Sequence, residues 1–287
     1  MFILIGTTSI FYAKSIPNVY TSGILLSPKQ NQSSSGLESV SGLAAVAGIT
    51  IPQNKSQNLV DLSLEVLSSK DFFEVLFKDT DFLKDLVASD YYDPYSKKVI
   101  YDDEKYDTKN NKLKQFTLNK IQYPSFQLSF ETFSTKHLNF KKDLKTGFVS
   151  ISIEHISPVV AKNWLDKIHF ELNSYVKGIK TKEANDFKDY LTNELAENKL
   201  PELGLILSGL IKQQIQTLML AEASDDYVFY IVDSPRVAEL KTGPNRAILC
   251  ILFTSIGMFF IIFLIIILDI YKLKLSPSLS SLRLFKQ

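Results

Sequence analysis

One run of 22 residues constrains this chain more than any other feature. From Ala247 to Leu268 no side chain is charged, and only Thr254, Ser255 and Gly257 interrupt the apolar run. As a helix, such a run spans roughly 33 Å, enough to cross the hydrocarbon core of a bilayer. A buried helix of a soluble core is the alternative, but such helices usually keep a polar side over this length. The run therefore predicts a transmembrane helix that begins at Ala247 and ends at Leu268.

The residues that flank this run suggest its orientation. Arg246 and Asp269 bracket it, and the tail 269–287 carries four basic residues and one acidic residue. An excess of basic residues favours the cytoplasmic side of a membrane, so we expect a short cytoplasmic tail. Arg236 and Lys241 on the other flank weaken this assignment.

The N-terminal segment 1–13 is also apolar, but it is too short to span a bilayer. Its first basic residue is Lys14, so it lacks the basic start of a secretory signal peptide. A signal-like segment, a peripheral helix and the second half of a transmembrane helix whose start is missing are all open. We favour the third, because the segment runs into a polar region without a cleavage pattern. The chain would then be a hairpin with 14–246 on one side of the membrane.

The composition excludes several classes of protein. The 287 residues include 32 Lys and Arg against 31 Asp and Glu, a net charge of +1, which argues against a nucleic-acid binder. Cys250 is the single cysteine, so a disulfide framework and a cysteine-based zinc site are excluded.

Three segments of the body predict strands. Residues 15–28 are punctuated by prolines and favour an extended strand, and 147–155 alternates apolar and polar side chains. Residues 227–232, YVFYIV, predict a last strand. Between the first two, Gly42–Ile49 is a small-residue apolar patch that suits close packing.

Apolar spacings of three and four predict the helices. Residues 58–88 fit this pattern, with Ser69 or Asp71 as the cap of a second helix. Ser157 and Pro158 are a strong helix start. From there an apolar stripe recurs about every four residues as far as Val176 and then continues, through Val160, Trp164, Ile168, Leu172, Val176, Phe187, Leu191 and Leu195. A helix from Pro158 to Asn198 would be about 60 Å long, with Gly178 as a possible kink. A further helix is expected at 203–223.

The stretch 90–145 has two interpretations. Residues 97–145 hold 11 Lys against 6 Asp and Glu. They could contact an anionic polysaccharide, or they could form a solvated loop-and-helix surface that lysines keep soluble.

No motif for catalysis, a cofactor or a metal is present. The chain has no GxxxxGK[ST], GxSxG or HExxH sequence. His137, His155 and His169 lie far apart in the sequence without metal-ligand spacing, and the acidic pair Asp225–Asp226 lies in a polar loop. We expect no enzyme, no cofactor and no metal site.

The order of several segments resembles the Wzz chain-length determinants, the class 1 polysaccharide co-polymerases. IPNVYTS follows the first apolar segment, then come GLAAVAGI and LSSKDFFEVLF. VSISIEHISPVVAKNWLDKI and QQIQTLMLAEASDDYVFYIVDSPRVAELKTGPNRAI lead to the closing apolar helix. The similarity covers nearly the whole chain but is loose over 90–145. No single motif is diagnostic, whereas their order is specific.

The resemblance implies an α+β protein of the bacterial inner membrane. A membrane-proximal α/β base, about 14–90 and 147–246, would carry a helical extension at about 90–223, and two transmembrane helices, the first truncated, would anchor this periplasmic body. It implies homo-oligomeric rings that work with a Wzy-type polymerase to set the chain length of O-antigen or a related glycan. By the family pattern, Pro235 and Pro244 form the proline-rich approach to the membrane, and Gly257 is the small residue of the helix.

These observations lead to the hypothesis of a non-catalytic scaffold. Gly257 with Ser255 and Thr254 would form a small, polar patch where another helix or the polymerase approaches closely. A glycine without any role in a membrane helix is the alternative. The growing glycan or its lipid carrier is a further candidate partner. Two other functions remain open, a membrane-tethered periplasmic ligand-binding or sensor module and a glycan-directed enzyme.

Overall fold

The computed structural model describes residues 2–29, 57–118, 121–197 and 200–280. The chain forms two compact units, Met1–Val19 with Leu240–Gln287, and Tyr20–Glu239. The patch predicted at Gly42–Ile49 lies outside the described residues. The mixture of helix and sheet with long helices confirms the α+β class.

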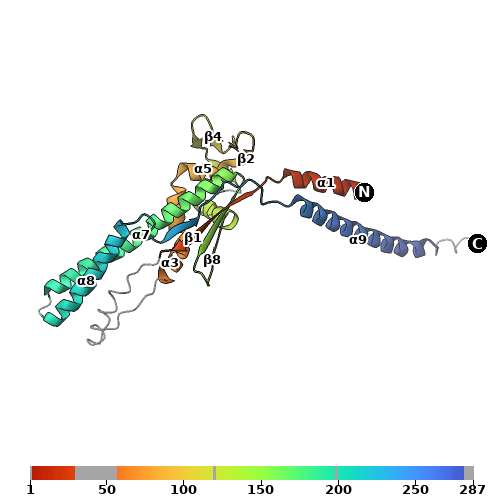
Figure 1. Cartoon of the computed structure of the whole chain (residues 1–287). Coiled ribbons are helices and arrows are strands. Elements are labelled where there is room, and N and C mark those ends of the chain that lie inside the picture. The colour runs from red at the N-terminus through yellow and green to blue at the C-terminus, as the bar shows by residue number, and fades with distance from the viewer. Residues whose placement is uncertain (1, 30–56, 119–120, 198–199, 281–287) are drawn as a thin grey trace, which may run out of the picture. The chain divides into compact units, whose positions relative to one another are not determined.

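The larger unit is organised around a four-stranded antiparallel sheet (Figure 1). Its order is β10 (Phe229–Asp233), β1 (Tyr20–Pro28), β9 (Val149–His155) and β8 (Leu138–Lys142). Strands β1, β9 and β10 confirm the three predicted strand positions. Strand β8 is a strand that the sequence did not predict.

The alternation along β9 explains why one face of the sheet is buried. Val149, Ile151 and Ile153 are buried, whereas the alternate residues Ser150 and Glu154 are exposed. In the ladder Ile151 lies opposite Ile24 of β1 on one side and Phe140 of β8 on the other. The apolar face packs against helix α7, which contacts both β1 and β9.

Helix α7 (Pro158–Glu197) is a single helix of 40 residues, close to the length that the sequence predicts. Its start is capped by Ser157, whose hydroxyl oxygen accepts a hydrogen bond from the Val160 N–H at 3.4 Å. The predicted stripe is buried from Val160 to Val176 and again at Leu191. The prediction is wrong for Phe187, which is 42% exposed, and the helix is not interrupted at Gly178.

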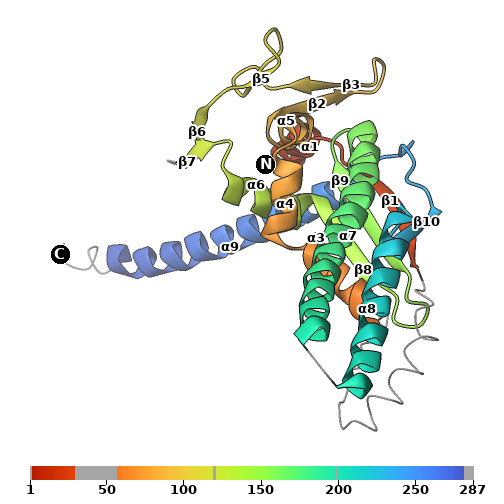
Figure 2. The same ribbon diagram turned by 90° about the vertical axis from the view of Figure 1, so that its left-hand side faces the viewer.

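Helix α8 (Pro201–Glu222) confirms the next predicted helix and packs along α7 (Figures 1 and 2). Pro201 stands at its start, where a missing N–H costs nothing. Ala221 is the one buried side chain among the described residues of α8. Among the described residues, this helix therefore buries few of its side chains fully.

The predicted helical region 58–88 consists of α3 (Gln57–Leu67), α4 (Lys70–Phe77) and α5 (Thr80–Ala88). Ser69 caps α4, because its Oγ accepts from the Phe72 N–H at 3.1 Å, and Asp71 instead lies inside the first turn. Asp79 caps α5 by accepting from the Asp81 N–H at 2.7 Å, a cap that the sequence reading missed.

Residues 89–137 differ from the predicted loop-and-helix surface. They form three small hairpins, β2–β3 (Ser89–Asp93, Lys98–Tyr101), β4–β5 (Tyr106–Asp107, Lys112–Leu113) and β6–β7 (Phe116–Leu118, Ile121–Tyr123). Then follow α6 (Phe126–Thr132) and a π-helical turn, η1 (Phe133–His137). Strands of two to five residues are too short for alternation to reveal them. The segment is also less solvated than expected, because Phe133 is buried in the core.

The smaller unit contains α1 (Phe2–Ser15) and α9 (Arg246–Ser280). Within the described residues, α9 is the one helix long and apolar enough to cross a membrane, over Arg246–Phe263. The helix begins one residue before Ala247 and runs on past Leu268, so Leu268 is not a helix end as predicted. Charged residues follow Leu268, but the helix continues because no glycine follows and the first proline that could end it is Pro277.

Candidate functional site

Hydrogen bonds join the two chain segments of the smaller unit next to its helices. The Val19 N–H donates to the Gly243 carbonyl at 2.9 Å, and the Thr242 N–H donates to the Val19 carbonyl at 2.9 Å. The Arg246 guanidinium donates to Asn18 Oδ1 at 3.0 Å and to the Ile16 carbonyl at 3.4 Å. We call residues 16–19 with 242–246 the neck.

The two predicted approach prolines lie in different units. Pro244 is a half-buried residue of the neck. Pro235 is buried in the larger unit, next to Arg236, whose carbonyl accepts a hydrogen bond from the Ser22 hydroxyl at 2.7 Å. Pro235 therefore belongs to the packing of the segment after β10, and only Pro244 stands directly before α9.

The predicted small patch on α9 is divided between two faces. Cys250, Thr254 and Gly257 are partly buried and, at spacings of four and three, share one side of the helix. That side faces α1, since the Cys250 sulfur lies 3.9 Å from the Ser9 carbonyl. Ser255 is exposed and points elsewhere. Ala247 is likewise exposed.

The hydroxyl of Thr254 is already used inside α9. It donates to the Cys250 carbonyl at 2.7 Å, so it offers no free donor to a neighbouring helix. Tyr12 and Phe253 add an edge-to-face ring contact at 5.1 Å between α1 and α9. Gly257 lies on the side of α9 that faces α1 and stays a predicted site of close helix approach, to which Thr254 contributes mainly its small size.

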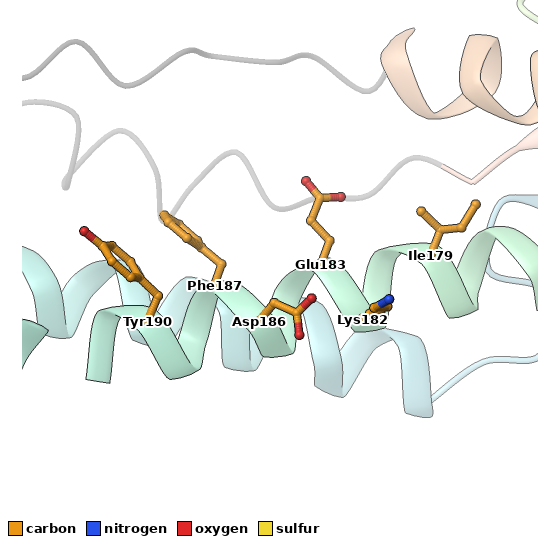
Figure 3. Close-up of a pocket in the computed structure, with 6 residues that line it drawn as sticks. All are labelled: Ile179, Lys182, Glu183, Asp186, Phe187 and Tyr190. Carbon is orange, nitrogen blue, oxygen red and sulfur yellow. The ribbon is translucent and has the colours of Figure 1, made fainter. Parts of the chain in front are cut away.

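The outer half of α7 presents a mixed apolar and charged face. A surface hollow of about 550 Å³ is lined by Ile179, Lys182, Glu183, Asp186, Phe187 and Tyr190. Figure 3 shows Ile179, Glu183 and Phe187 projecting from the same side of the helix. Phe187 and Tyr190 are exposed aromatic side chains on a helix that is otherwise charged there. Such a face suits contact with another protein surface better than enclosure of a small molecule.

The structure brings together two histidines that the sequence reading treated as unrelated. The rings of His137 and His155 lie 5.7 Å apart, and both pack against Trp164, at 5.5 and 5.0 Å. His137 ends the π-helical turn and His155 ends β9, so the β8–β9 hairpin makes them neighbours. His169 stays apart and lies 3.2 Å from the Phe229 carbonyl. Among the described residues, no group of three potential metal ligands is close enough to hold an ion.

The environment of His155 fits the neutral imidazole. Nδ1 accepts from the Ser157 N–H at 3.0 Å, so Nε2 carries the proton and donates to the Asp85 carbonyl at 3.1 Å. A second proton on Nδ1 would point at another N–H. Burial, with His137 alongside, lowers the pKa of His155 to about 4. Burial also lowers the pKa of His137.

Asp85 and Tyr101 form the other perturbed pair of the larger unit. The Tyr101 hydroxyl donates to Asp85 Oδ1 at 2.5 Å. Burial raises the pKa of Asp85, and burial together with this carboxylate raises the pKa of Tyr101. Perturbed pKa values can mark catalytic groups. Here, however, the two groups are hydrogen-bonded to each other, and neither lines the hollow on α7.

The basic stretch supports neither of its two interpretations alone. Lys97, Lys98 and Lys109 are exposed on the hairpins, as an anion-binding surface and a solvated surface both require. Lys142 instead pairs with Asp61 across the larger unit, so part of the positive charge is structural.

Comparison with known proteins gives matches among solved structures alone. No protein-family model matches the chain, and no curated protein matches it. A fragment of WzzB, the polysaccharide co-polymerase from Salmonella Typhimurium, is 12% identical, with a TM-score of 0.39 over 79% of this chain and 100% of that one. A full-length bacterial polysaccharide co-polymerase is 12% identical, with a TM-score of 0.33 over 99% of this chain and 93% of that one.

Both of these structures are polysaccharide co-polymerases, the family that the sequence motifs resemble. At these TM-scores no residue-by-residue correspondence follows, so the roles of individual residues rest on this chain's own geometry.

Proposed function

We propose that this protein regulates the chain length of a surface polysaccharide, lipopolysaccharide O-antigen or a related glycan. It acts as a non-catalytic, homo-oligomeric scaffold in the bacterial inner membrane. Segments 1–13 and 247–268 are the membrane anchors, 14–246 is the periplasmic body and 269–287 is a cytoplasmic tail. A Wzy-type polymerase is the proposed partner, with the growing glycan or its lipid carrier as a further contact.

The order of the sequence motifs supports the class of function, and one observation supports the scaffold mechanism. In the described part of the chain, helices α7 and α8 form a long hairpin whose outer half has few fully buried side chains. Large apolar side chains remain exposed along it, among them Phe187, Tyr190, Leu205 and Met219. Contiguous exposed apolar surface marks contact with other chains. A protein whose main extension is covered only by other subunits fits a scaffold.

The sheet order provides a second supporting observation. Strand β1 begins directly after the neck residue Val19, and β10 leads back toward the neck. These two strands are neighbours in the sheet, paired at Leu26 and Ile231. The segments by which the chain enters and leaves the larger unit are therefore neighbouring strands of its sheet.

The sensor alternative has weaker support. A ligand-binding module needs a concave site with convergent polar groups. The hollow on α7 is lined by side chains of a single helix, Ile179, Lys182, Glu183, Asp186, Phe187 and Tyr190.

Two measurements test the function. Deletion of the gene should change the length distribution of surface polysaccharide on a gel, and the wild-type gene should restore it. Size measurement of the full chain in mild detergent should give a large, discrete oligomer. An unchanged length distribution after deletion refutes the regulatory function, and a monomer refutes the scaffold mechanism.

A further inference from the structure

We infer that the subunits of the scaffold join by sheet extension, with strand β10 of one copy pairing antiparallel with strand β8 of the next copy. This inference rests on the proposed oligomeric scaffold and names its joint. Strands β10 and β8 are the two edges of the four-stranded sheet (Figure 2). Edge strands carry unpaired backbone groups and pair readily unless something protects them.

The first residue of β10 is protected, because the Phe229 N–H and carbonyl bond to the Asn173 amide. Among the described residues, the rest of this edge carries less protection. Tyr230, Ile231 and Val232 are consecutive and all exposed, with Val232 47% exposed. No lysine or proline stands within Phe229–Asp233. A solvent-exposed edge strand with three exposed apolar residues in a row is a template for pairing with another chain.

The direction of the strands favours β8 as the strand of the next copy that pairs with β10. In the antiparallel order β10-β1-β9-β8, strands β1 and β8 run one way while β10 and β9 run the other. Copies anchored in one membrane are related by rotation about its normal, which preserves strand direction. An antiparallel ladder therefore forms between β10 and β8 of the next copy, whereas β10 against β10 would be parallel.

Charge favours the same pairing. Strand β10 has acidic residues at both ends, Asp225 and Asp226 before it and Asp233 at its end. Strand β8 has basic residues at both ends, Lys136 before it and Lys141 and Lys142 at its end. In the antiparallel pairing each acidic end meets a basic end, although Lys142 already pairs with Asp61 and Asp233 lies 3.7 Å from Arg236. Pairing of β10 with itself would set Asp233 against Asp233, which is repulsive.

The two faces of the sheet limit the registers in which β10 can pair with β8 of the next copy. Ile231 lies opposite Leu26, and Phe140 lies opposite Ile151, so both point to the face that α7 covers. When Ile231 faces Phe140 of the next copy, this apolar face continues across the joint. Val232, which the β1–β10 ladder skips between the pairs of Ile231 and Asp233, then lies next to Asn139, and both are exposed on their own strands. The joint is heterologous, so repetition closes a ring or continues as an open chain.

Cysteine cross-linking tests this register in the full chain. In a Cys250→Ser background, Val232→Cys combined with Asn139→Cys places thiols on opposite edges of one sheet. Three strand spacings separate these edges, roughly 14 Å, so a disulfide between them within one chain is excluded. Across the joint, directly opposite Cβ atoms lie about 5 Å apart. Mild oxidation in membranes should give a ladder of dimers, trimers and larger species.

The controls separate the possible results. Each single-cysteine variant should stay monomeric on a denaturing gel, and Val232→Cys with Ser150→Cys, on the interior strand β9, should give no ladder. Dimers from Val232→Cys alone would show self-pairing of β10 and overturn the inference. A large oligomer without the Val232–Asn139 ladder also overturns it while leaving the scaffold intact. A wild-type monomer refutes the scaffold itself.

A charge placed on the edge tests the joint without cysteines. Val232→Lys should shift the detergent-extracted protein to smaller species. Ile100→Lys, at a 51% exposed position on the β2–β3 hairpin, should leave the size unchanged. Equal sizes for both variants and the wild type would contradict the joint.

Discussion

The side-chain amide of Asn173 forms hydrogen bonds with both polar backbone groups of Phe229. Its Oδ1 accepts from the Phe229 N–H at 3.0 Å, while its Nδ2 donates to the Phe229 carbonyl at 3.1 Å. The same Oδ1 also accepts from the Val228 N–H at 2.8 Å. Asn173 is only 2% exposed, so water cannot replace these bonds. Helix α7 thus fixes the position at which β10 joins the sheet.

Replacement of Asn173 by leucine should destabilise the protein strongly. It leaves two buried N–H groups unpaired, so we expect a loss of about 2–4 kcal/mol in the free energy of unfolding. Asn173→Asp keeps an acceptor for the two N–H groups but buries a carboxylate whose second oxygen faces the Phe229 carbonyl, so it should also destabilise the protein. Thermal unfolding of the detergent-extracted protein measures this. The matched control is Ser174→Leu at the exposed neighbouring position, and equal losses for the two leucine variants would contradict the prediction.

His155 should make stability depend on pH in a definite direction. Its pKa is lowered to about 4 in the folded protein from 6.5. Above pH 6.5 both states are neutral and the histidine contributes no pH dependence. As the pH falls from 6.5 to about 4 the unfolded state binds the proton first, so stability falls by roughly 3 kcal/mol from this group.

The variant His155→Gln isolates this contribution from that of the carboxylates. Unfolding curves at pH 7.5 and pH 4.5 should differ less for the variant than for the wild type. Trp164 is the single tryptophan and contacts the His155 ring, so its fluorescence reports protonation in the folded state. An identical pH dependence for the variant and the wild type would count against a neutral His155.

Gly257 and Ser255 should respond differently to enlargement. Gly257→Leu inserts a large side chain on the face of α9 that packs toward α1, so we expect a shifted polysaccharide length distribution with the protein still membrane-inserted. Ser255→Leu places the same side chain on another face and should change the distribution less. An unchanged gel ladder for Gly257→Leu removes the proposed role of this glycine. A larger effect of Ser255→Leu would instead indicate that the exposed face of α9 contacts the polymerase.

Leu191 and Phe187 separate folding from assembly on the α7–α8 hairpin. Leu191 is 3% exposed, so Leu191→Ala should lower local stability by about 2–4 kcal/mol, seen as faster hydrogen exchange in α8. Phe187→Ala should change hydrogen exchange little but weaken the oligomer in detergent. The prediction is wrong if Phe187→Ala destabilises α8 as much as Leu191→Ala does.

The regular elements were predictable because their periodicity is long. Helix α7 repeats its apolar stripe over many turns, and β9 alternates over seven residues. Phe187 fits the stripe by spacing and is nevertheless exposed, because this outer part of α7 stands clear of the sheet and α8 does not cover that side. Spacing identifies a face of a helix, but it does not identify what covers it.

The local polar contacts could not be predicted in the same way. The His137–His155 pair depends on the β8–β9 hairpin, and β8 itself was missed because its LNFKK sequence carries two lysines at an edge. Asn173 offered one usable signal, since it follows His169 by four residues and a polar pair on a buried helix face requires partners. Its partner, the backbone of Phe229, is distant in sequence and carries no side-chain signature.

The neck has a mechanical consequence. Its hydrogen bonds between Val19, Thr242 and Gly243 tie together the segments that follow α1 and precede α9. Arg246 adds a bond to Asn18 across the same point, so a slip of one segment past the other by a single residue would break several bonds at once. At the neck the spacing of the two segments is therefore that of two paired strands. The neck is a fixed joint between the two segments, so a force that pulls on either helix acts on both.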